Sequence, residues 1–459
     1  MEMPPIPPDT DHATIDHALD TLSAHATEWA RLPIRRKIEM LEGLKPRIAG
    51  VAGRWVTAAS RAKGLPVGSP LRGEEWTSGP WATVNYVDPL ADTLRHIQAG
   101  TLDELLDGRV RQRPDGQTVV RVVPDGVYDR LLLSGVEVDV WQQPGVTPDA
   151  LADTMGVFYK EPMPEGKVAL VLGAGNIAAI PPLDVLYKLY AEGEVVLLKM
   201  NPVNSYLGPV LEEAFAEFVD AGYLRFAYGG ADVGTYLTRY DAVDTIHVTG
   251  SAQTHDAIVY GTGAEGAKRK AADDPAIDTP VTSELGGISP CIVVPGDWSE
   301  PDLDFQAEHV ASQKMHNGGF NCIASQVLVL PEEWEQRDAF MDAVHDTFAA
   351  LPDRPAYYPG ADDRLAELAD AYPDAETMGE TGTRTLVPDV PPEPGQPAFT
   401  TEVFGPALAV TSLPGGSASQ DPGEWLARAV AWCNDTLDRK SGSAGMPRPI
   451  QESRMPSSA

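Results

Sequence analysis

Hydrophobic positions follow two different patterns along the 459-residue chain. In residues 11–62, apolar side chains recur every three or four positions, as at Leu19, Leu22, Ile38 and Leu41, which predicts amphipathic helices. Farther along, short continuous apolar runs predict buried strands. These runs alternate with helical segments, which is typical of parallel strands joined by crossover helices. The predicted strands are residues 168–172, 195–199, 224–228, 245–249, 290–294, 326–331 and 407–411.

Turn residues and composition shifts complete this outline. Residues 63–66 (KGLP) end the first helical region. Valines alternate with acidic residues in residues 117–143, around a Pro-Asp-Gly turn, which predicts an antiparallel ribbon. Residues 264–280 are predicted to be a surface excursion, residues 387–397 a connector, and residues 439–459 a disordered tail. Further helices are predicted at residues 81–99, 101–106, 182–191, 206–220, 233–238, 302–313, 333–349, 362–371 and 425–438.

Composition narrows the class of protein. The chain has 35 Lys and Arg against 67 Asp and Glu, a formal net charge of −32, which disfavours nucleic acids and anionic membranes as partners. It shows neither an apolar run long enough to span a membrane nor a basic leader followed by an apolar stretch. The 3 cysteines are far apart and odd in number, which fits a reducing, cytoplasmic setting. No cysteine or histidine pairing indicates a metal site.

The segment HNGGFNCIAS, residues 316–325, holds the strongest candidate for chemistry. Its Asn-Gly-Gly triplet should end the preceding helix, and the apolar run after it should be a buried strand. Cys322 would then lie on a loop held between two rigid elements, where reactive groups are commonly placed. Most free cysteines are small buried hydrophobic residues, so this segment alone leaves both interpretations open.

A glycine-rich turn follows the first predicted parallel strand. Residues 173–178 (GAGNIA) fit the GxGxxA pattern of dinucleotide-binding turns, which would place a pyrophosphate at the N-terminus of the next helix. Five further motifs follow in the chain. They are Lys199 at the end of a strand, Thr249-Gly250-Ser251, Glu284-Leu285-Gly286-Gly287, Cys322, and Glu402-Val403-Phe404-Gly405-Pro406.

In this order, the motifs resemble those of the aldehyde dehydrogenase superfamily, over nearly the whole chain. The resemblance implies an α/β fold with two Rossmann-like parallel-sheet domains and a small antiparallel oligomerisation ribbon at residues 117–143. Residues 1–116 and 144–281 would form the cofactor-binding domain, and residues 282–438 the catalytic domain. It also implies an NAD(P)-dependent oxidoreductase that converts an aldehyde to a carboxylic acid through a cysteine thiohemiacetal and thioester, and that forms homo-oligomers.

The resemblance assigns roles to individual positions. Cys322 matches the nucleophile, Glu284 the general base, and Asn176 the amide that stabilises the oxyanion, so Asn176 should face the aldehyde and not the phosphates. An aldehyde releases hydride only after a nucleophile has added to its carbonyl carbon, which is chemistry suited to a thiolate. The positions matching cofactor contacts are Lys199, Gly250, Ser251, Leu285, Glu402 and Phe404.

The sequence departs from the family pattern at several positions. Phe320 stands where a polar residue is usual, which affects the substrate class. Pro202 stands where an acidic residue often approaches the ribose, so either NAD or NADP could be the cofactor. The chain ends sooner after Pro406 than family members do, which predicts an incomplete catalytic domain and weakened oligomer assembly. Two alternatives stay open: a reductase that transfers the acyl group to coenzyme A, and an inactive family member.

Overall fold

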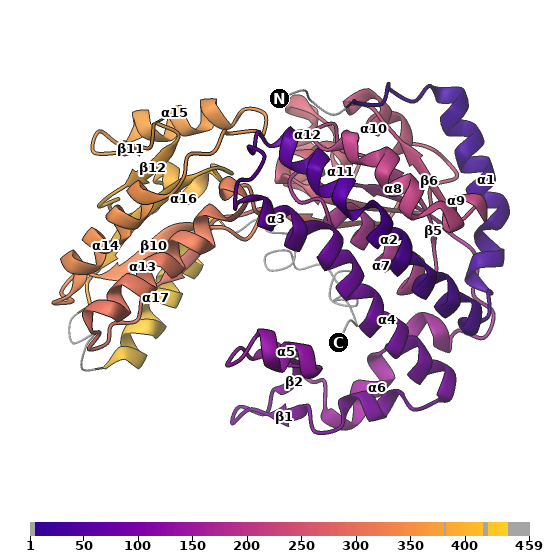
Figure 1. Cartoon of the computed structure of the whole chain (residues 1–459), viewed down its shortest axis with the longest axis horizontal. Helices are drawn as coiled ribbons and strands as arrows, with labels where there is room; N and C mark the ends of the chain where they lie inside the picture. The colour runs from indigo at the N-terminus through magenta and orange to yellow at the C-terminus, as the bar shows by residue number, and fades with distance from the viewer. Residues whose placement is uncertain (1–4, 381, 416–420, 439–459) are drawn as a thin grey trace.

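The computed structural model describes residues 5–380, 382–415 and 421–438. These residues form two five-stranded sheets and a separate three-stranded antiparallel sheet (Figure 1). Both large sheets have parallel strands at their centres and helices packed against them, which confirms the predicted fold class. Among the described residues, no helix is long and apolar enough to cross a membrane.

The first large sheet has the strand order β6-β5-β4-β7-β8, and all its strands are parallel. Every residue of β4 and β5 is buried, because helices cover both faces of such a sheet. The chain moves outward from β4 to β6 and then returns to β7 on the other side of β4. Ligands bind outside the carboxyl ends of strands at such a switch point. The strands are β4 (Val168–Leu172), β5 (Val195–Lys199), β6 (Leu224–Ala227), β7 (Thr245–Gly250) and β8 (Val281–Leu285).

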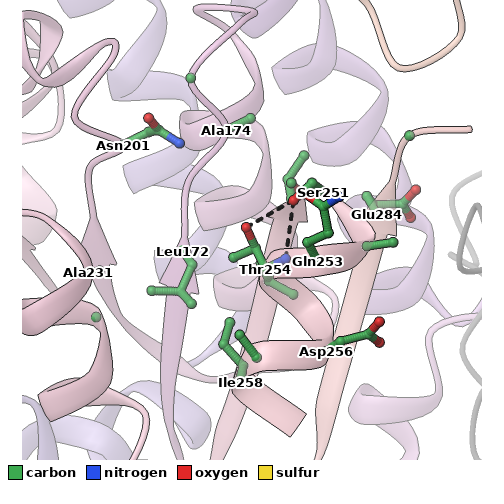
Figure 2. A pocket seen from close by; sticks show the side chains of 18 of the residues that line it. Leu172, Ala174, Asn201, Ala231, Ser251, Gln253, Thr254, Asp256, Ile258 and Glu284 are labelled. Carbon is green, nitrogen blue, oxygen red and sulfur yellow. Dashed lines mark hydrogen bonds between the residues drawn. The ribbon is translucent and has the colours of Figure 1, made fainter. Parts of the chain in front are cut away.

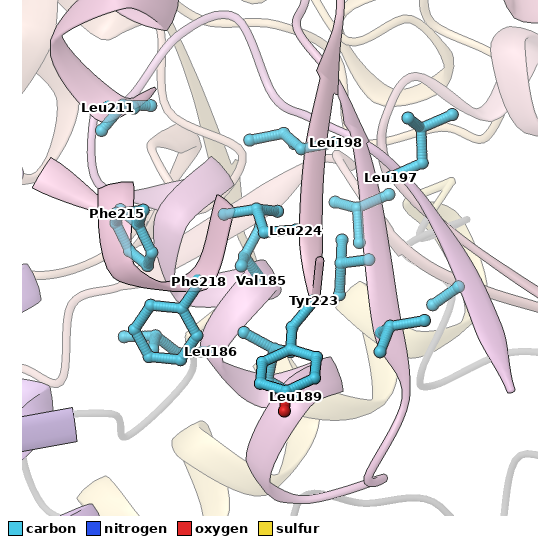
Figure 3. Packing of buried hydrophobic residues seen from close by; sticks show 14 of the residues in the cluster. Val185, Leu186, Leu189, Leu197, Leu198, Leu211, Phe215, Phe218, Tyr223 and Leu224 are labelled. Atoms are coloured by element: carbon cyan, nitrogen blue, oxygen red, sulfur yellow. The ribbon is translucent and has the colours of Figure 1, made fainter. Parts of the chain in front are cut away.

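Some helices that pack against this sheet precede β4 in the sequence, and others lie between its strands. Leucine and phenylalanine side chains of α7, α8 and α9 pack against β5 and β6 (Figure 3). Trp29 of α1 is buried, and its indole nitrogen donates to the Leu189 carbonyl at 2.8 Å. The helices are α1 (His12–Ala30), α2 (Ile34–Ala62), α3 (Arg72–Trp76), α4 (Ala82–Ala99), α6 (Leu151–Thr154), α7 (Ile180–Tyr190), α8 (Gly208–Ala214), α9 (Ala216–Asp220), α10 (Ala231–Leu237), α11 (Ala252–Val259) and α12 (Gly263–Ala272).

One lysine lies inside this helical layer. Lys37 of α2 is 1% exposed, and its Nζ lies 4.7 Å, 4.8 Å and 5.3 Å from the ring centroids of Trp29, Phe158 and Tyr159. Burial lowers the pKa of its ammonium group to about 7. The three aromatic faces offset part of the cost of burying this charge.

The second large sheet has the order β11-β12-β13-β10-β9, with only β11 antiparallel to its neighbour. Separate hydrophobic clusters lie on its two faces, one including α13 and α14 and the other including α15 to α17. The strands are β9 (Ser289–Ile292), β10 (Ser325–Pro331), β11 (Glu376–Met378), β12 (Arg384–Val387) and β13 (Ala407–Leu413). The helices are α13 (Glu300–Met315), α14 (Arg337–Ala350), α15 (Ala361–Ala371), α16 (Pro397–Thr400) and α17 (Pro422–Thr436).

The antiparallel sheet lies apart from both large sheets (Figure 1). Its strands are β1 (Val110–Gln112), β2 (Thr118–Val123) and β3 (Val138–Trp141). The predicted ribbon corresponds to β2 and β3, but β1 precedes it, and a short helix α5 (Val127–Leu132) replaces a simple turn. Tyr128, Leu131 and Leu132 of α5 are each more than 70% exposed.

Several sequence predictions were wrong in detail. The predicted surface excursion at residues 264–280 contains α12, a helix whose only buried residue is Gly266. The helical region at residues 11–62 is two helices separated at Pro33, and residues 206–220 hold a short 3₁₀ turn, α8 and α9. Strands β8, β11 and β12 were not predicted. The predicted tail, residues 439–459, lies outside the described residues.

Candidate active site

A cleft of about 1630 Å³ lies between the two large sheets. Its walls come from residues that follow β4, β5, β7 and β8, and from residues that precede β10 and β13. Figure 2 shows part of the first group, with Ser251 and Glu284 facing the same space. Leu285 is the predicted site residue that does not line the cleft. The predicted residues that do line it are Asn176, Lys199, Gly250, Ser251, Glu284, Cys322, Glu402 and Phe404.

The loop that carries Cys322 has little freedom to move. Helix α13 ends at Met315, and Asn317 and Gly318 then take positive φ values of 54° and 67°. Gly319 has φ 80°, and a Cβ there would lie 2.4 Å from the Gly405 carbonyl oxygen. Glycine is therefore required at residue 319 both by its φ and by the close backbone contact. The predicted helix–loop–strand setting of Cys322 is confirmed.

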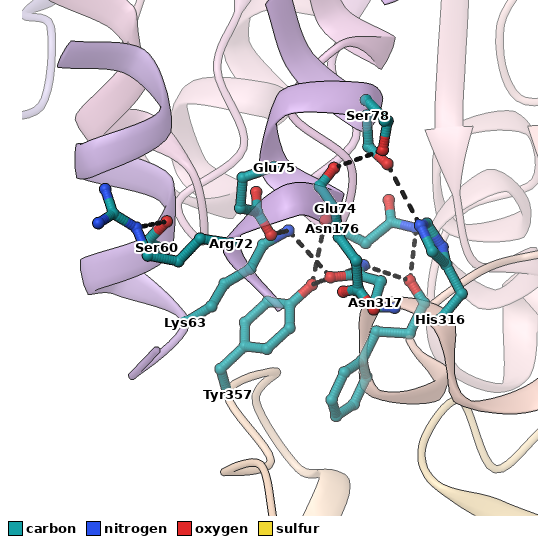
Figure 4. Close-up of polar contacts among 12 residues, drawn as sticks. Ser60, Lys63, Arg72, Glu74, Glu75, Ser78, Asn176, His316, Asn317 and Tyr357 are labelled. Atoms are coloured by element: carbon teal, nitrogen blue, oxygen red, sulfur yellow. Dashed lines mark hydrogen bonds and ion pairs between the residues drawn. The ribbon is translucent and has the colours of Figure 1, made fainter. Parts of the chain in front are cut away.

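A buried polar network supports this loop from below (Figure 4). Lys63 donates to the side-chain oxygen of Asn317 at 2.9 Å and forms an ion pair with Glu75 at 2.8 Å. Lys63 and Glu75 side chains are 3% and 1% exposed. Arg354 pairs with Glu74, which also accepts the Asn317 backbone N–H at 3.1 Å. Because Lys63, Glu75 and Arg354 are buried, the network holds the loop in place.

Asn176 lies against the same loop, as predicted. Its side-chain amide donates to the Phe320 carbonyl at 2.9 Å. Its backbone carbonyl accepts hydrogen bonds from the Asn317 amide at 3.1 Å and from the Tyr357 hydroxyl at 3.0 Å. The glycine-rich turn after β4 is therefore tied to the Cys322 loop.

The electrostatic surroundings of Cys322 favour the neutral thiol. Burial raises the pKa of its thiol, and the negative charges of Glu402 and Glu284 raise it further. The backbone N–H groups of Cys322 and Ile323 act in the opposite direction. Cys322 therefore depends on a nearby base to form the thiolate near neutral pH.

Glu284 lies at the end of β8 within a polar cluster that the sequence interpretation missed. Burial raises the pKa of its carboxyl, His247 lowers it, and Asp184 raises it. His247 and Thr249 of β7 pair in register with Thr282 and Glu284 of β8. The His247 ring contacts the Thr282 hydroxyl at 2.9 Å, and its other nitrogen lies 3.7 Å from Asp184. A histidine within the otherwise apolar run TIHV was the available sequence signal.

Glu402 approaches the cleft from the loop before β13. A Cβ on Gly286 would lie 2.3 Å from its Oε1, so the carboxylate rests on the Glu284–Gly287 turn. That oxygen is buried and has no hydrogen-bond partner among the described residues. Burial raises the pKa of Glu402 to about 7, although Lys314 and Arg364 lower it. No group of three side chains suited to a metal ion occurs in the described part of the chain.

The comparisons with known proteins agree with this geometry. The model of the aldehyde dehydrogenase family matches residues 142–357, which contain both Asn176 and Cys322. Residues 142–357 of the chain are thus similar to the aldehyde dehydrogenase family. It is 27% identical over 263 residues to a coniferyl aldehyde dehydrogenase from Pseudomonas sp. (strain HR199 / DSM 7063), covering 52% of this chain and 50% of that protein.

Other aldehyde dehydrogenases are similar to this chain at comparable levels of identity. Aldehyde dehydrogenase family 3 member A2 of Rattus norvegicus is 25% identical over 288 residues, covering 57% of this chain and 53% of that protein. The chain thus spans about half the length of these curated relatives. An aldehyde dehydrogenase from Mycobacterium tuberculosis, solved with NAD⁺, has a TM-score of 0.61 at 18% identity, covering 94% of this chain and 77% of that one.

The cleft has features that suit an anionic dinucleotide. The N-terminus of α11 faces it, capped by Ser251, whose hydroxyl accepts the Thr254 N–H at 3.1 Å. Backbone N–H groups at a helix N-terminus suit a pyrophosphate. Lys199 ends β5 at the same cleft, and Glu402 lines it from the opposite sheet.

Proposed function

We propose that this protein oxidises an aldehyde to a carboxylic acid, with Cys322 as the nucleophile and NAD or NADP as the hydride acceptor. The observation that carries the proposal is the Asn176 amide held 2.9 Å from the Phe320 carbonyl, two residues before Cys322, in a cleft that Glu284 also lines. An amide donor, a thiol and a carboxyl group around one space are the groups that this oxidation needs.

The first half of the reaction forms a carbon–sulfur bond. A base near Cys322, such as a water molecule in the cleft, accepts the thiol proton, and the Cys322 sulfur adds to the aldehyde carbon. The Asn176 amide and the Cys322 backbone N–H stabilise the resulting oxyanion. A nicotinamide cofactor held in this cleft would supply the hydride acceptor, and loss of hydride from this carbon would leave a thioester on Cys322.

The second half breaks the same bond. Glu284 removes a proton from water, and the hydroxide adds to the thioester carbon. The sulfur leaves with the bond electrons, takes up a proton, and the carboxylic acid is released. The raised pKa of Glu284 brings its basicity closer to neutral pH, where proton transfer is most effective.

Two substitutions test these roles. We expect Cys322→Ala to abolish NADH or NADPH formation across a panel of aldehydes, while cofactor binding by tryptophan fluorescence persists. Cys291→Ala, at a half-buried cysteine outside the cleft, is the matched control and should retain activity. Unchanged turnover in Cys322→Ala would refute the proposal.

The role of Glu284 is separable from that of Cys322. We expect Glu284→Gln to slow steady turnover by at least about 100-fold, since the general base of the hydrolytic step is lost. Thioester formation at Cys322 should then be seen by intact mass spectrometry after mixing with aldehyde and cofactor. Rapid turnover only when coenzyme A is added would show that a thiol, and not water, accepts the acyl group.

We also propose that the antiparallel sheet contacts a second copy of the chain. The support is the apolar surface of α5, where Tyr128, Leu131 and Leu132 are exposed. An exposed apolar patch of this kind marks interaction sites. Light scattering should show an oligomer that Leu131→Asp dissociates; a monomeric parent protein would contradict this.

A further inference from the structure

The N-terminal segment, residues 9–16, is fixed beside one wall of the cleft. The Thr10 N–H donates to the Tyr228 carbonyl at 3.0 Å, and the Tyr228 N–H donates to the Thr10 hydroxyl at 2.9 Å. Beyond it, the His12 ring stacks on Tyr236 of α10 with centroids 3.8 Å apart. The Tyr236 hydroxyl donates to Asp16 at 2.5 Å. The segment thus lies alongside α10 in space, at the point where the chain enters α1 (Figure 1).

These contacts place Asp9 at the carboxyl end of β6. A Cβ on Gly229 would lie 3.4 Å from the Asp9 carboxyl carbon, and the next residue, Gly230, lines the cleft. Asp9 is exposed and makes no hydrogen bond or ion pair with any residue that the structure describes. By contrast, Asp11 accepts the Thr14 N–H and so caps α1.

Lys199 lies on the neighbouring strand, within the electrostatic reach of Asp9. It pairs in register with Ala227, directly before Tyr228, and it lines the cleft. Burial lowers the pKa of Lys199, and the negative charge of Asp9 raises it. Asp9 therefore affects the potential at the end of β5, where a bound dinucleotide would place its adenosine ribose.

The residues directly after Lys199 include no acid that could oppose its positive charge. It continues Met200-Asn201-Pro202, and both Asn201 and Pro202 line the cleft. Arg239 adds a second cation to the same wall. Two cations without an acid would favour the 2′-phosphate of NADP, whereas a nearby carboxylate repels that phosphate and favours the free ribose hydroxyl of NAD.

We propose that Asp9, held in place by the Thr10–Tyr228 pair, is the specificity-determining residue that makes this cleft favour NAD over NADP. The inference rests on the proposed function only in that the dinucleotide binds in this cleft with its adenosine ribose near Lys199. It assigns a cofactor-selecting role to the N-terminal segment, which precedes the first helix of the fold.

Binding titrations of the full chain with NAD and with NADP, followed by tryptophan fluorescence, test the inference without requiring turnover. The parent protein should bind NAD more tightly than NADP. Asp9→Asn should tighten NADP binding by about tenfold and leave NAD binding within about twofold, because a single like charge is removed. Asp9→Glu keeps the charge and should keep the preference.

Asp342→Asn, on the exposed face of α14 in the other sheet's helical layer, controls for the change in net charge and should leave both affinities unchanged. An unchanged NADP to NAD ratio in Asp9→Asn, with both cofactors still binding, would overturn the inference alone. A parent protein that prefers NADP would also overturn it. If the parent protein binds neither dinucleotide, the proposed function falls together with the inference.

Discussion

The side-chain amide of Asn317 donates a hydrogen bond to the backbone carbonyl of Asn176, across a distance of 3.1 Å. The two residues lie next to strands of different sheets. Asn176 is in the turn after β4, and Asn317 precedes β10. This bond sets the position of the predicted oxyanion donor relative to the predicted nucleophile. Both sides of the cleft therefore depend on the buried network below the Cys322 loop.

Replacing Asn317 should destabilise the fold, and the size of the loss should depend on how well the new residue tolerates a positive φ. Asn317→Ala removes the buried hydrogen bonds from Lys63 to Asn317 and from Asn317 to the Asn176 carbonyl, at a cost of about 3 kcal/mol. Alanine also pays about 1 kcal/mol for the φ of 54°, which glycine does not. Urea unfolding should thus place Asn317→Gly between Asn317→Ala and the parent protein. Equal midpoints for the two variants would contradict the backbone argument.

The buried pair of Lys63 and Glu75 should show strong coupling. Glu75→Gln leaves the Lys63 charge buried beside Arg354, so we expect a loss of about 3–5 kcal/mol. The double variant Lys63→Met/Glu75→Gln should lose less than the sum of the single variants. Glu39→Gln breaks an exposed ion pair with Arg35 and should leave the free energy of unfolding nearly unchanged. Additive losses at Lys63 and Glu75 would show that the pair is not coupled.

The thiol of Cys322 should titrate above the usual range of a free cysteine. Burial and the charges of Glu402 and Glu284 raise its pKa, so alkylation by iodoacetamide should increase with pH into the alkaline range. Glu402→Gln removes a nearby negative charge and should shift this profile to lower pH. The measurement is the alkylated fraction of the Cys322 peptide by mass spectrometry, with Asp342→Asn as the control. A shift to higher pH would contradict the assigned electrostatics.

Lys37 should make stability depend on pH in the alkaline direction. Its pKa falls from 10.5 in the unfolded chain to about 7 in the fold, so the folded state disfavours its charge. The resulting destabilisation is complete below pH 7 and disappears as the pH rises toward 10.5. Relative to Lys37→Met, the parent protein should therefore gain up to about 1.4 kcal/mol per pH unit between these values.

Chemical denaturation at pH 7.5 and 9.5 measures this difference for Lys37. Lys167→Met, at an exposed lysine, should show the same pH dependence as the parent protein. A parallel pH dependence in Lys37→Met and the parent protein would show that the buried ammonium contributes nothing.

The strands that carry the site were predictable because they are buried, and each has a continuous apolar sequence. Residues 168–172 and 195–199 match β4 and β5 at both ends. The loop setting of Cys322 followed from the Asn-Gly-Gly triplet, whose residues do take positive φ values. Considering the motifs together and not singly predicted that Asn176 faces the aldehyde, and its amide contacts the Phe320 carbonyl two residues before Cys322.

Other features had no local signal. Helix α12 contains only glycine and alanine besides its charged residues, so no stripe of large apolar side chains marks it. Strand β12 is four residues long and draws its stability from neighbours on both sides. Lys63 and Asn317 are 254 residues apart, and Asp9 lies beside Gly229 only through tertiary contacts. Such pairings depend on chain topology, which periodicity does not encode.

The contact between Gly319 and the Gly405 carbonyl also bears on how the site could evolve. No side chain fits at residue 319, so a saturation library there should retain glycine alone. Ile323, directly after the cysteine, is 83% exposed and constrained by no comparable contact. The loop therefore joins an invariable position to a permissive one. Side-chain diversity at residue 323 should therefore leave the geometry of the nucleophile undisturbed.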